Sequence, residues 1–162
     1  QVERTLTRLA YEIVERNRGA ENLTIFGIEN AGAQLARSLA RLLSQMEGHR
    51  IDAHGLDVTA FRDDIDDGPV DRLFDPSDEV DVSDRDVILV DDVLHTGRTV
   101  RAALDAVVRF GRPRSIQLMV LIDRGHREYP IQPDYVGKTI PTRSGESVVV
   151  EQGDDIAVLV VG

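Results

Sequence analysis

The sequence contains no cysteine and no tryptophan, and Lys138 is its only lysine. Without cysteine there is no disulfide bond and no thiol chemistry, which fits a reducing compartment. No apolar run approaches the roughly 20 residues that a membrane-spanning helix needs. No short apolar segment of the kind found in secretory signals opens the chain. We therefore expect a cytoplasmic protein without a membrane partner.

Positive charge is also scarce, because 19 basic residues stand against 29 acidic ones and the formal net charge is −10. Such an average charge disfavours general binding to nucleic acid. The charge is uneven, however: acids dominate between Asp57 and Asp84, and bases dominate between Arg109 and Arg143. A local basic face is therefore still compatible with the sequence.

Apolar residues recur with helical and strand spacing along most of the 162 residues, which is the length of one domain. The pattern predicts helices over 2–18, 33–46 and 99–110, and strands over 23–28, 51–59, 86–90, 115–122, 148–150 and 156–161. This alternation predicts a single α/β domain, residues 1–162, with a mainly parallel sheet flanked by helices. The acidic segment 61–84 interrupts it, and loops of that length are typically functional flaps.

The strand over 86–90 leads into the most informative stretch of the chain. Four apolar residues are followed by the adjacent carboxylates of Asp91 and Asp92, and then by a turn that ends in Thr-Gly-Arg-Thr. A carboxylate pair suits the hydroxyls of a ribose or Mg²⁺. The turn supplies backbone N–H groups, hydroxyls and a helix start, which suit a phosphate monoester. The alternative is a plain strand end, with aspartates as helix caps and a Thr–Gly turn. The stretch consists of Val87, Ile88, Leu89, Val90, Asp91, Asp92, Val93, Leu94, His95, Thr96, Gly97, Arg98 and Thr99.

Two further predicted strands end in polar turns that contain glycine, at 29–32 and at 123–127. The carboxyl ends of parallel strands share one edge of a sheet, where ligands bind in α/β proteins. We therefore expect these two turns and the stretch 91–99 to form one cleft.

The stretch Val87–Thr99 resembles the phosphoribosyl-pyrophosphate (PRPP) motif of type I phosphoribosyltransferases. Further segments, in the same order, resemble the PyrR family, whose members are both pyrimidine-operon attenuation regulators and uracil phosphoribosyltransferases. These segments are Leu6–Ala10, Glu15–Asn17, Phe61–Asp64, Gly111–Pro113, Asp123–Glu128 and Asp134–Lys138. The resemblance covers nearly the whole chain and implies a type I phosphoribosyltransferase fold with a flexible flap and a small hood.

The resemblance also implies an activity, in which uracil displaces pyrophosphate from PRPP to give UMP, with Mg²⁺ as the only cofactor. By similarity, Asp91 and Asp92 hold the ribose and Mg²⁺, and the turn after them holds the 5′-phosphate. The implied 5′-phosphate residues are Thr96, Gly97, Arg98 and Thr99. The implied uracil-side residues are Asp123, Arg124 and Arg127, and the implied flap residues are Arg62, Asp63 and Asp64. For Arg62 the alternative is an exposed loop charge.

A second implied role is binding of a hairpin in pyrimidine leader mRNA, favoured by UMP, by a homodimer or homotetramer. RNA of this kind is recognised through phosphates and exposed loop bases. For His126 and Arg127 the alternative is an exposed polar turn. The implied RNA contacts are Thr7, Arg8, Arg16, His126, Arg127 and Lys138.

The sequence departs from the family pattern at two places. The pyrophosphate loop of the family usually carries a basic residue followed by Thr-Arg-Gly, whereas this chain has Glu29, Asn30, Ala31 and Gly32. One charge pair at about 4–5 Å is worth about 3–4 kcal/mol at an effective dielectric near 20. The loop lacks positive charges that would attract pyrophosphate and has a negative charge instead, so we expect weak transferase activity. On the expected RNA face, Tyr11 replaces a usual histidine and Gln132 a usual basic residue. The alternatives are a nucleobase phosphoribosyltransferase that binds no RNA, and a nucleotide-binding homologue with neither activity.

Overall fold

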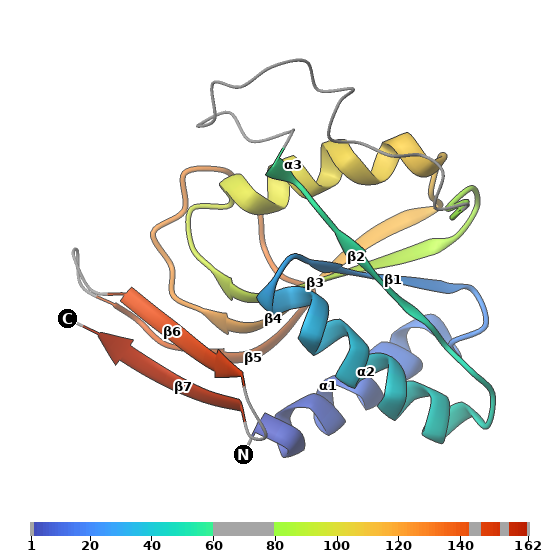
Figure 1. The fold of residues 1–162 in the computed structure, drawn as a ribbon, viewed down its shortest axis with the longest axis horizontal. Helices are drawn as coiled ribbons and strands as arrows, with labels where there is room; N and C mark the ends of the chain where they lie inside the picture. The colour runs from blue at the N-terminus through green and yellow to red at the C-terminus, as the bar shows by residue number, and fades with distance from the viewer. Residues whose placement is uncertain (1, 60–79, 143–146, 153–155, 162) are drawn as a thin grey trace.

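The computed structural model describes residues 2–59, 80–142, 147–152 and 156–161. They form three layers, with a five-stranded sheet between helices (Figure 1). Helices α1 (Val2–Asn17) and α2 (Ala31–Glu47) pack on one face of the sheet, and α3 (Arg98–Val107) packs on the other. A short 3-10 helix, η4 (Val108–Phe110), continues α3. The predicted α/β architecture is confirmed.

All neighbouring strands of the large sheet are parallel, and their order is β2-β1-β3-β4-β5. The strands are β1 (Leu23–Ile28), β2 (Ala53–Leu56), β3 (Asp86–Leu94), β4 (Ser115–Asp123) and β5 (Tyr135–Thr139). Strands covered on both faces read as continuous apolar runs. This explains β1, in which all six residues are buried.

Successive residues of the central strands fill two separate cores. Ile25 and Ile88 pack with the apolar stripes of α1 and α2, whereas Phe26 and Leu89 pack with the apolar stripe of α3. This alternation follows from the two-residue period of a strand. The sheet is therefore held rigidly from both sides, up to the edge where its carboxyl ends lie.

A small antiparallel pair, β6 (Ser147–Gln152) and β7 (Ile156–Val161), stands apart from the large sheet (Figure 1). Strand β6 lies next to β3 and α2. The resemblance implies a small hood, and this pair contains the described strands that lie outside the large sheet. In the described part of the chain, no helix is both long and apolar enough to cross a membrane.

The structure corrects several predicted boundaries. Helix α2 begins at Ala31 instead of residue 33, β2 is limited to Ala53–Leu56, and β3 extends to Leu94 instead of ending at Val90. Strand β5 was not predicted at all. Its sequence Tyr-Val-Gly-Lys-Thr has little apolar character because β5 is an edge strand.

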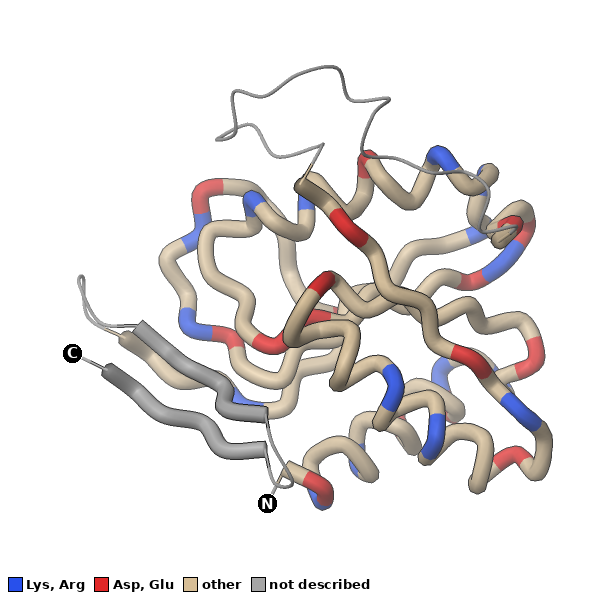
Figure 2. The backbone as a smooth tube through the Cα atoms, in the orientation of Figure 1, with Lys and Arg blue, Asp and Glu red and all other residues tan. Residues whose placement is uncertain are grey.

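The predicted flap lies mostly outside the described residues, and so do Arg62, Asp63 and Asp64. Its last part belongs to the core instead. Val82 is fully buried and its N–H donates to the carbonyl of Phe110 at 3.2 Å. Acidic and basic positions are interspersed along the described chain (Figure 2), because most of the acid-rich segment falls within 60–79.

A buried carboxylate fixes the start of β3. Asp86 is 5% exposed and accepts hydrogen bonds from Arg114, from the Ser115 hydroxyl at 2.7 Å and from the Asn22 amide at 3.3 Å. Chiefly because of the Arg114 hydrogen bonds, its pKa falls from 3.8 to about 2. The ionised carboxylate therefore stabilises the folded state.

We expect Asp86→Asn to destabilise the protein by about 1–2 kcal/mol at pH 7, since the shift is worth roughly 2 kcal/mol and the exposed Arg114 is screened by solvent. A lowered pKa gives stability that is present above pH 4 and lost as the pH falls towards 2. Urea unfolding at pH 7 and pH 3 measures this, with the exposed Asp105→Asn on α3 as the control. An equal loss of stability between these pH values in Asp86→Asn and in the unaltered protein contradicts the prediction.

Candidate functional site

The strand order creates a switch point between β1 and β3. The chain leaves β1 through α2 towards β2 on one side, and it leaves β3 through α3 towards β4 on the other side. In open α/β sheets, ligands bind at the carboxyl ends of two neighbouring strands whose following connections run to opposite sides. The structure therefore brings together the predicted loops 29–32 and 91–99 at one edge, with the end of β4 beside them.

Asp91 and Asp92 lie inside β3, beyond the last residue that pairs with β1. Strand β3 pairs with β1 only as far as Val90, but with β4 as far as Leu94. In a regular strand, residues three apart point to opposite faces of the sheet. Val90 and Val93 both pack with the α1/α2 core, so the alternation of side chains is interrupted at the two aspartates. Their side chains bond to the local backbone: Asp91 Oδ1 accepts from the Asp92 N–H, and Asp92 Oδ1 from the Val93 N–H, both at 2.8 Å.

The carboxyl of Asp91 is buried and has an unfavourable charge. Its pKa lies well above the ordinary value because of burial and the neighbouring Asp92 carboxylate. A divalent cation would offset both effects, and hard oxygen ligands suit Mg²⁺. No cluster of three or more histidine or acidic side chains that could hold a metal occurs among the described residues. Two carboxylates fill only part of the coordination shell of Mg²⁺, which usually keeps several waters and binds through one or two carboxylates together with substrate phosphates.

A tight turn follows β3, and residues 95–97 are here called the phosphate loop. Gly97 has φ of 92°, a left-handed conformation that favours glycine. The Arg98 N–H, the first of α3, donates to the Thr96 hydroxyl at 3.2 Å. The Arg98 side chain pairs with a neighbouring acid, since its Nε donates to Glu128 Oε2 at 2.6 Å. Backbone N–H groups and hydroxyls at the start of a helix are groups that can bind an anion.

The backbone of the loop over 29–32 packs closely against β3. A Cβ atom on Gly32 would lie 2.4 Å from the Val90 carbonyl oxygen, and one on Gly27 would lie 2.3 Å from the Gly32 carbonyl oxygen. Glycine is therefore required at both positions. The Glu29 side chain lies over β2, because a Cβ on Gly55 would be 2.4 Å from Glu29 Oε1. Its negative charge is thus on the far side of β1 from Asp91.

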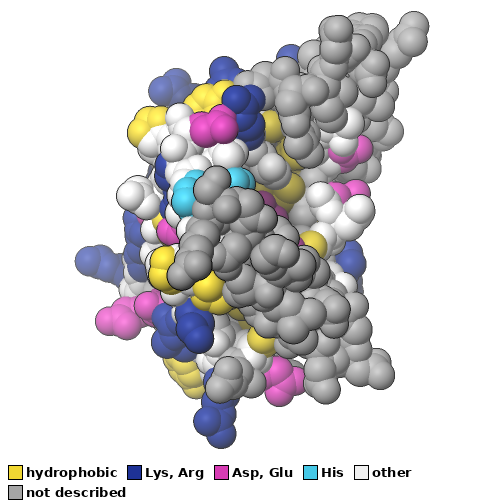
Figure 3. All heavy atoms as spheres, turned by 90° about the vertical axis from the view of Figure 1, so that its left-hand side faces the viewer, with side chains coloured by type: hydrophobic (Ala, Val, Ile, Leu, Met, Phe, Trp, Pro, Cys, Tyr) yellow, Lys and Arg dark blue, Asp and Glu magenta, His cyan; other side chains and the backbone are white. Residues whose placement is uncertain are grey.

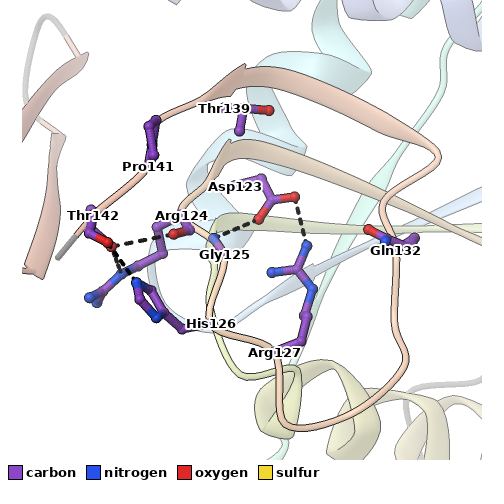
Figure 4. Close-up of a pocket in the computed structure, with 9 residues that line it drawn as sticks. All are labelled: Asp123, Arg124, Gly125, His126, Arg127, Gln132, Thr139, Pro141 and Thr142. Atoms are coloured by element: carbon purple, nitrogen blue, oxygen red, sulfur yellow. Dashed lines mark hydrogen bonds and ion pairs between the residues drawn. The ribbon is translucent and has the colours of Figure 1, made fainter. Parts of the chain in front are cut away.

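A cavity of about 420 Å³ opens beside the end of β4 (Figure 4). Asp123 lies at its inner end and bonds to Arg127 Nη2 at 2.6 Å. Burial alone would raise the pKa of Asp123, but hydrogen bonds from Arg127 and from the Gly125 N–H outweigh burial and lower it. The cavity is lined by Asp123, Arg124, Gly125, His126, Arg127, Gln132, Thr139, Pro141 and Thr142.

The last three of these residues were missed by the sequence prediction. Thr139 is the last residue of β5, and Pro141 and Thr142 follow it. The weak apolar pattern of β5 predicted no strand there. The signal for these residues would have been a polar segment at the end of a fifth parallel strand. The carboxyl end of such a strand lies at the same edge of the sheet as the other predicted turns. The three predicted uracil-side residues, Asp123, Arg124 and Arg127, do line one cavity.

The predicted RNA residues are only partly free to meet a partner. Arg8 donates to the Gly137 carbonyl at 2.7 Å, and Arg16 pairs with Asp134 at 2.8 Å, so both connect α1 to β5. His126 Nε2 lies 2.6 Å from the Thr142 carbonyl oxygen. Lys138 is exposed on β5, and Tyr11 is 61% exposed on α1. The Thr7 hydroxyl donates within α1, to the Glu3 carbonyl.

Basic side chains lie above and below histidine side chains on the face shown in Figure 3. Arg127 does not belong to the exposed basic side chains, since its side chain is only 18% exposed. The alternative of an exposed polar turn therefore does not apply to Arg127, because its guanidinium donates hydrogen bonds inside the protein.

Solved structures share this arrangement. The HGPRT-ase from Leishmania tarentolae in complex with GMP aligns with a TM-score of 0.67 and 21% identity, covering 88% of this chain and 78% of that chain. The likeness defines a protein with the type I phosphoribosyltransferase fold. Residues 1–154 match the phosphoribosyl transferase domain family.

Curated relatives are more similar in sequence. The bifunctional protein PyrR of Deinococcus radiodurans is 52% identical over 166 residues, covering 98% of this chain and 90% of the relative. That of Limosilactobacillus fermentum is 52% identical over 152 residues, covering 92% and 85%. The chain therefore belongs to the phosphoribosyl transferase domain family and, within it, to the PyrR family.

Proposed function

We propose that this protein binds UMP and PRPP at the switch point and regulates pyrimidine-synthesis genes by binding leader mRNA, with weak uracil phosphoribosyltransferase activity. The contrast between two loops carries the proposal. On one side are the paired carboxylates of Asp91 and Asp92 and the tight turn at Gly97. On the other side, the loop over 29–32 has no basic side chain. Such a site suits a ribose 5-phosphate better than a pyrophosphate.

In the proposed complex, Asp91 and Asp92 accept the ribose hydroxyls, and the Thr96 and Thr99 hydroxyls with the N–H groups of the turn bind the 5′-phosphate. Mg²⁺ held with PRPP at the two carboxylates would neutralise negative charge on the substrate oxygens. The uracil lies in the cavity beside Asp123 and Arg124. We also propose that residues 1–162 form a single domain that assembles as a homodimer or homotetramer.

The transfer breaks the bond between C1 of the ribose and a pyrophosphate oxygen, and forms the bond between C1 and N1 of uracil. The proton on N1 of uracil is released to water or to the leaving pyrophosphate. Catalysis of this step depends on positioning and on stabilisation of charge. The loop over 29–32 offers only backbone N–H groups and the start of α2 to the leaving pyrophosphate. Because Glu29 lies over β2, the missing positive charges, more than repulsion by Glu29, account for the weak activity that we propose.

The test is a pair of measurements on the same protein. Calorimetric titration with UMP and with PRPP, both with Mg²⁺, should show that UMP binds more tightly. A steady-state assay of UMP formation should give turnover far below the ordinary enzyme range of about 1–10³ s⁻¹. Ordinary turnover would contradict the weak-transferase proposal, and absence of UMP binding would contradict the whole proposal.

We expect Gly97→Ala to weaken UMP binding about tenfold, because a left-handed conformation costs an alanine about 1–2 kcal/mol and the turn must shift. The added Cβ would also lie 3.3 Å from Tyr129 Cβ. Calorimetry measures the affinity. Gly48→Ala is the matched control, since Gly48 has φ of 74° at the end of α2 with open space around it. Equal UMP affinity in Gly97→Ala and the unaltered protein would show that the turn does not bind phosphate.

We expect Lys138→Gln to weaken binding to a leader hairpin for all sequences alike and to reduce the slope of log K against log salt by about one, as for one lost phosphate contact. Filter binding with and without UMP measures both quantities. The control is Arg41→Gln on the exposed face of α2.

A transferase without RNA binding is the second candidate function. The internal contacts of Arg8 and Arg16 favour it, because they leave fewer positive groups for phosphates. No binding of the hairpin by the unaltered protein at low salt would select this candidate.

A further inference from the structure

Each of the three guanidinium nitrogens of Arg127 donates a hydrogen bond inside the protein. Nη2 donates to Asp123 Oδ2 at 2.6 Å, Nη1 donates to the His95 carbonyl at 3.0 Å, and Nε donates to the Ile131 carbonyl at 2.8 Å. Its side chain is 18% exposed and that of Asp123 is 15% exposed. The planar guanidinium presents several donors in a fixed fork geometry, which makes these three contacts possible. A lysine ammonium cannot reproduce this geometry.

These contacts connect two segments that belong to different parts of the proposed site. His95 is in the phosphate loop, 95–97. The segment 124–131, here called the base loop, follows Asp123 and ends at Ile131. Its residues 124–127 line the cavity beside β4. Arg127 therefore touches the phosphate loop, the inner end of the base cavity and the end of the base loop at once.

Further contacts join the same two loops. The Thr96 carbonyl accepts from the Glu128 N–H at 2.8 Å and from the Tyr129 N–H at 3.0 Å. From the opposite direction, Arg98 Nε donates to Glu128 at 2.6 Å. The His95 ring Nδ1 lies 3.2 Å from the Gly125 carbonyl oxygen. The two loops are thus connected by backbone and side-chain hydrogen bonds in both directions, and Arg127 is the buried member of this set.

We propose that Arg127 is a positioning residue, which orients the Asp123 carboxylate in the base cavity and ties the base loop to the phosphate loop, so that base and 5′-phosphate are bound by one rigid unit. This inference rests on the proposed function, because it assigns UMP to the same site. It also separates Arg127 from the RNA-contacting residues with which the sequence grouped it.

The test uses two probes, UMP and ribose 5-phosphate, which has no base. Asp123→Asn should weaken UMP binding and leave ribose 5-phosphate binding unchanged, since Asp123 lies only in the base cavity. Arg127→Gln should weaken both, UMP by about 10- to 100-fold, as expected for loss of charged hydrogen bonds. Arg127→Lys should give an intermediate UMP affinity, because it keeps the charge beside Asp123 but not the fork. Arg41→Gln is the control for loss of an exposed arginine.

A double-mutant cycle decides whether Arg127 acts through Asp123. The double variant Arg127→Gln/Asp123→Asn should bind UMP no more weakly than Arg127→Gln alone. If the two effects add, Arg127 does not act through Asp123 and the first half of the inference is wrong. If Arg127→Gln binds ribose 5-phosphate like the unaltered protein, the link to the phosphate loop is wrong.

A readout without ligand keeps the test independent of UMP binding. Among the described residues that line the cavity, the other ionisable groups are Arg124 and His126 of the base loop. The remaining lining residues at this end, Thr139 of β5 and Pro141 and Thr142 after it, carry no charge. NMR titration of the Asp123 carboxyl carbon should show a higher midpoint in Arg127→Gln, and an unchanged midpoint in Arg127→Lys. An unchanged midpoint in Arg127→Gln overturns the positioning role.

The outcomes also separate the two proposals. If the unaltered protein binds no UMP, the proposed function fails, whatever the Asp123 titration shows. If it binds UMP and Arg127→Gln binds UMP equally well, only the present inference fails. A variant that loses hairpin binding alone, with UMP binding intact, would identify Arg127 as an RNA contact and overturn the inference.

Discussion

A protein carrying Glu29→Lys and Ala31→Arg should form UMP from uracil and PRPP with kcat/KM about 100-fold above that of the unaltered chain. The expected gain comes from positive charge beside the leaving pyrophosphate. One charge pair at about 4–5 Å is worth about 3–4 kcal/mol at an effective dielectric near 20. Solvent at this exposed loop screens much of that energy, which leaves roughly two factors of ten for the pair of substitutions.

The two positions should contribute unequally. Ala31 is the first residue of α2, next to the glycine that contacts β3, so an arginine there starts close to the switch point. Glu29 is exposed and its carboxylate lies over Gly55 of β2. We therefore expect Ala31→Arg alone to give most of the increase and Glu29→Lys alone to give little.

Steady-state kinetics of the two single variants and the double variant measure this expectation. Gln45→Arg adds one positive charge, as Ala31→Arg does, on an exposed position near the other end of α2, and is the control for a general effect of that charge. The PRPP affinity should rise with kcat/KM, while UMP affinity should hardly change, because UMP has no pyrophosphate. A double variant no faster than the unaltered protein would show that the loop is not the cause of weak transfer.

Replacing Asp91 with asparagine should weaken binding of UMP and of Mg²⁺-PRPP about 100-fold and at the same time stabilise the ligand-free fold. The loss of affinity follows from removing a carboxylate that accepts ribose hydroxyls or a metal ion, since charged hydrogen bonds are worth about 1.5–3 kcal/mol each. The asparagine keeps an Oδ1 atom for the Asp92 N–H, so the local backbone should not change.

The gain in stability follows from the raised pKa of Asp91, which results from burial and the Asp92 carboxylate. A group whose pKa is raised in the folded state destabilises that state as the pH rises from its ordinary pKa through the folded one. At pH 7 each unit of such a shift costs about 1.4 kcal/mol. The asparagine variant avoids this cost, so its unfolding free energy should be higher at pH 7 and should depend less on pH.

Calorimetry with UMP and urea unfolding between pH 4 and pH 7 measure the two halves of this prediction. Asp105→Asn on α3 is the control, because it removes an exposed carboxylate far from the switch point. A variant that binds UMP normally would show that Asp91 does not hold the ribose. A variant that is less stable at pH 7 would show that the buried carboxylate has a structural role.

The central part of the fold could be predicted from local sequence alone. Strands β1, β3 and β4 are apolar runs because both of their faces are covered, and α1 and α2 have apolar stripes at helical spacing. The stretch Val87–Thr99 showed its strand, its carboxylates and its turn in consecutive residues. The edge strand β5 could not be predicted, because a strand with one exposed edge needs less apolar character.

The orientation of charged side chains was decided only by the tertiary structure. Arg16 bonds to Asp134, 118 residues further along the chain, and Arg8 bonds to the carbonyl of Gly137. Neither contact has a local signature, because any exposed arginine on α1 has the same helical spacing. Glu29 likewise lies over Gly55 only because β1 and β2 pair in that register.

The sequence by itself therefore determined the chemical groups of the site, since the ribose-phosphate elements lie within one continuous stretch. The tertiary structure decided how far β3 extends past β1, which places Asp91 and Asp92 at the switch point. It also decided that Arg127 is internal, because its three partners lie on β4, on the phosphate loop and at the end of the base loop. Local patterns encode burial and periodicity, whereas the partners of a long side chain depend on contacts that form only when distant segments pack together.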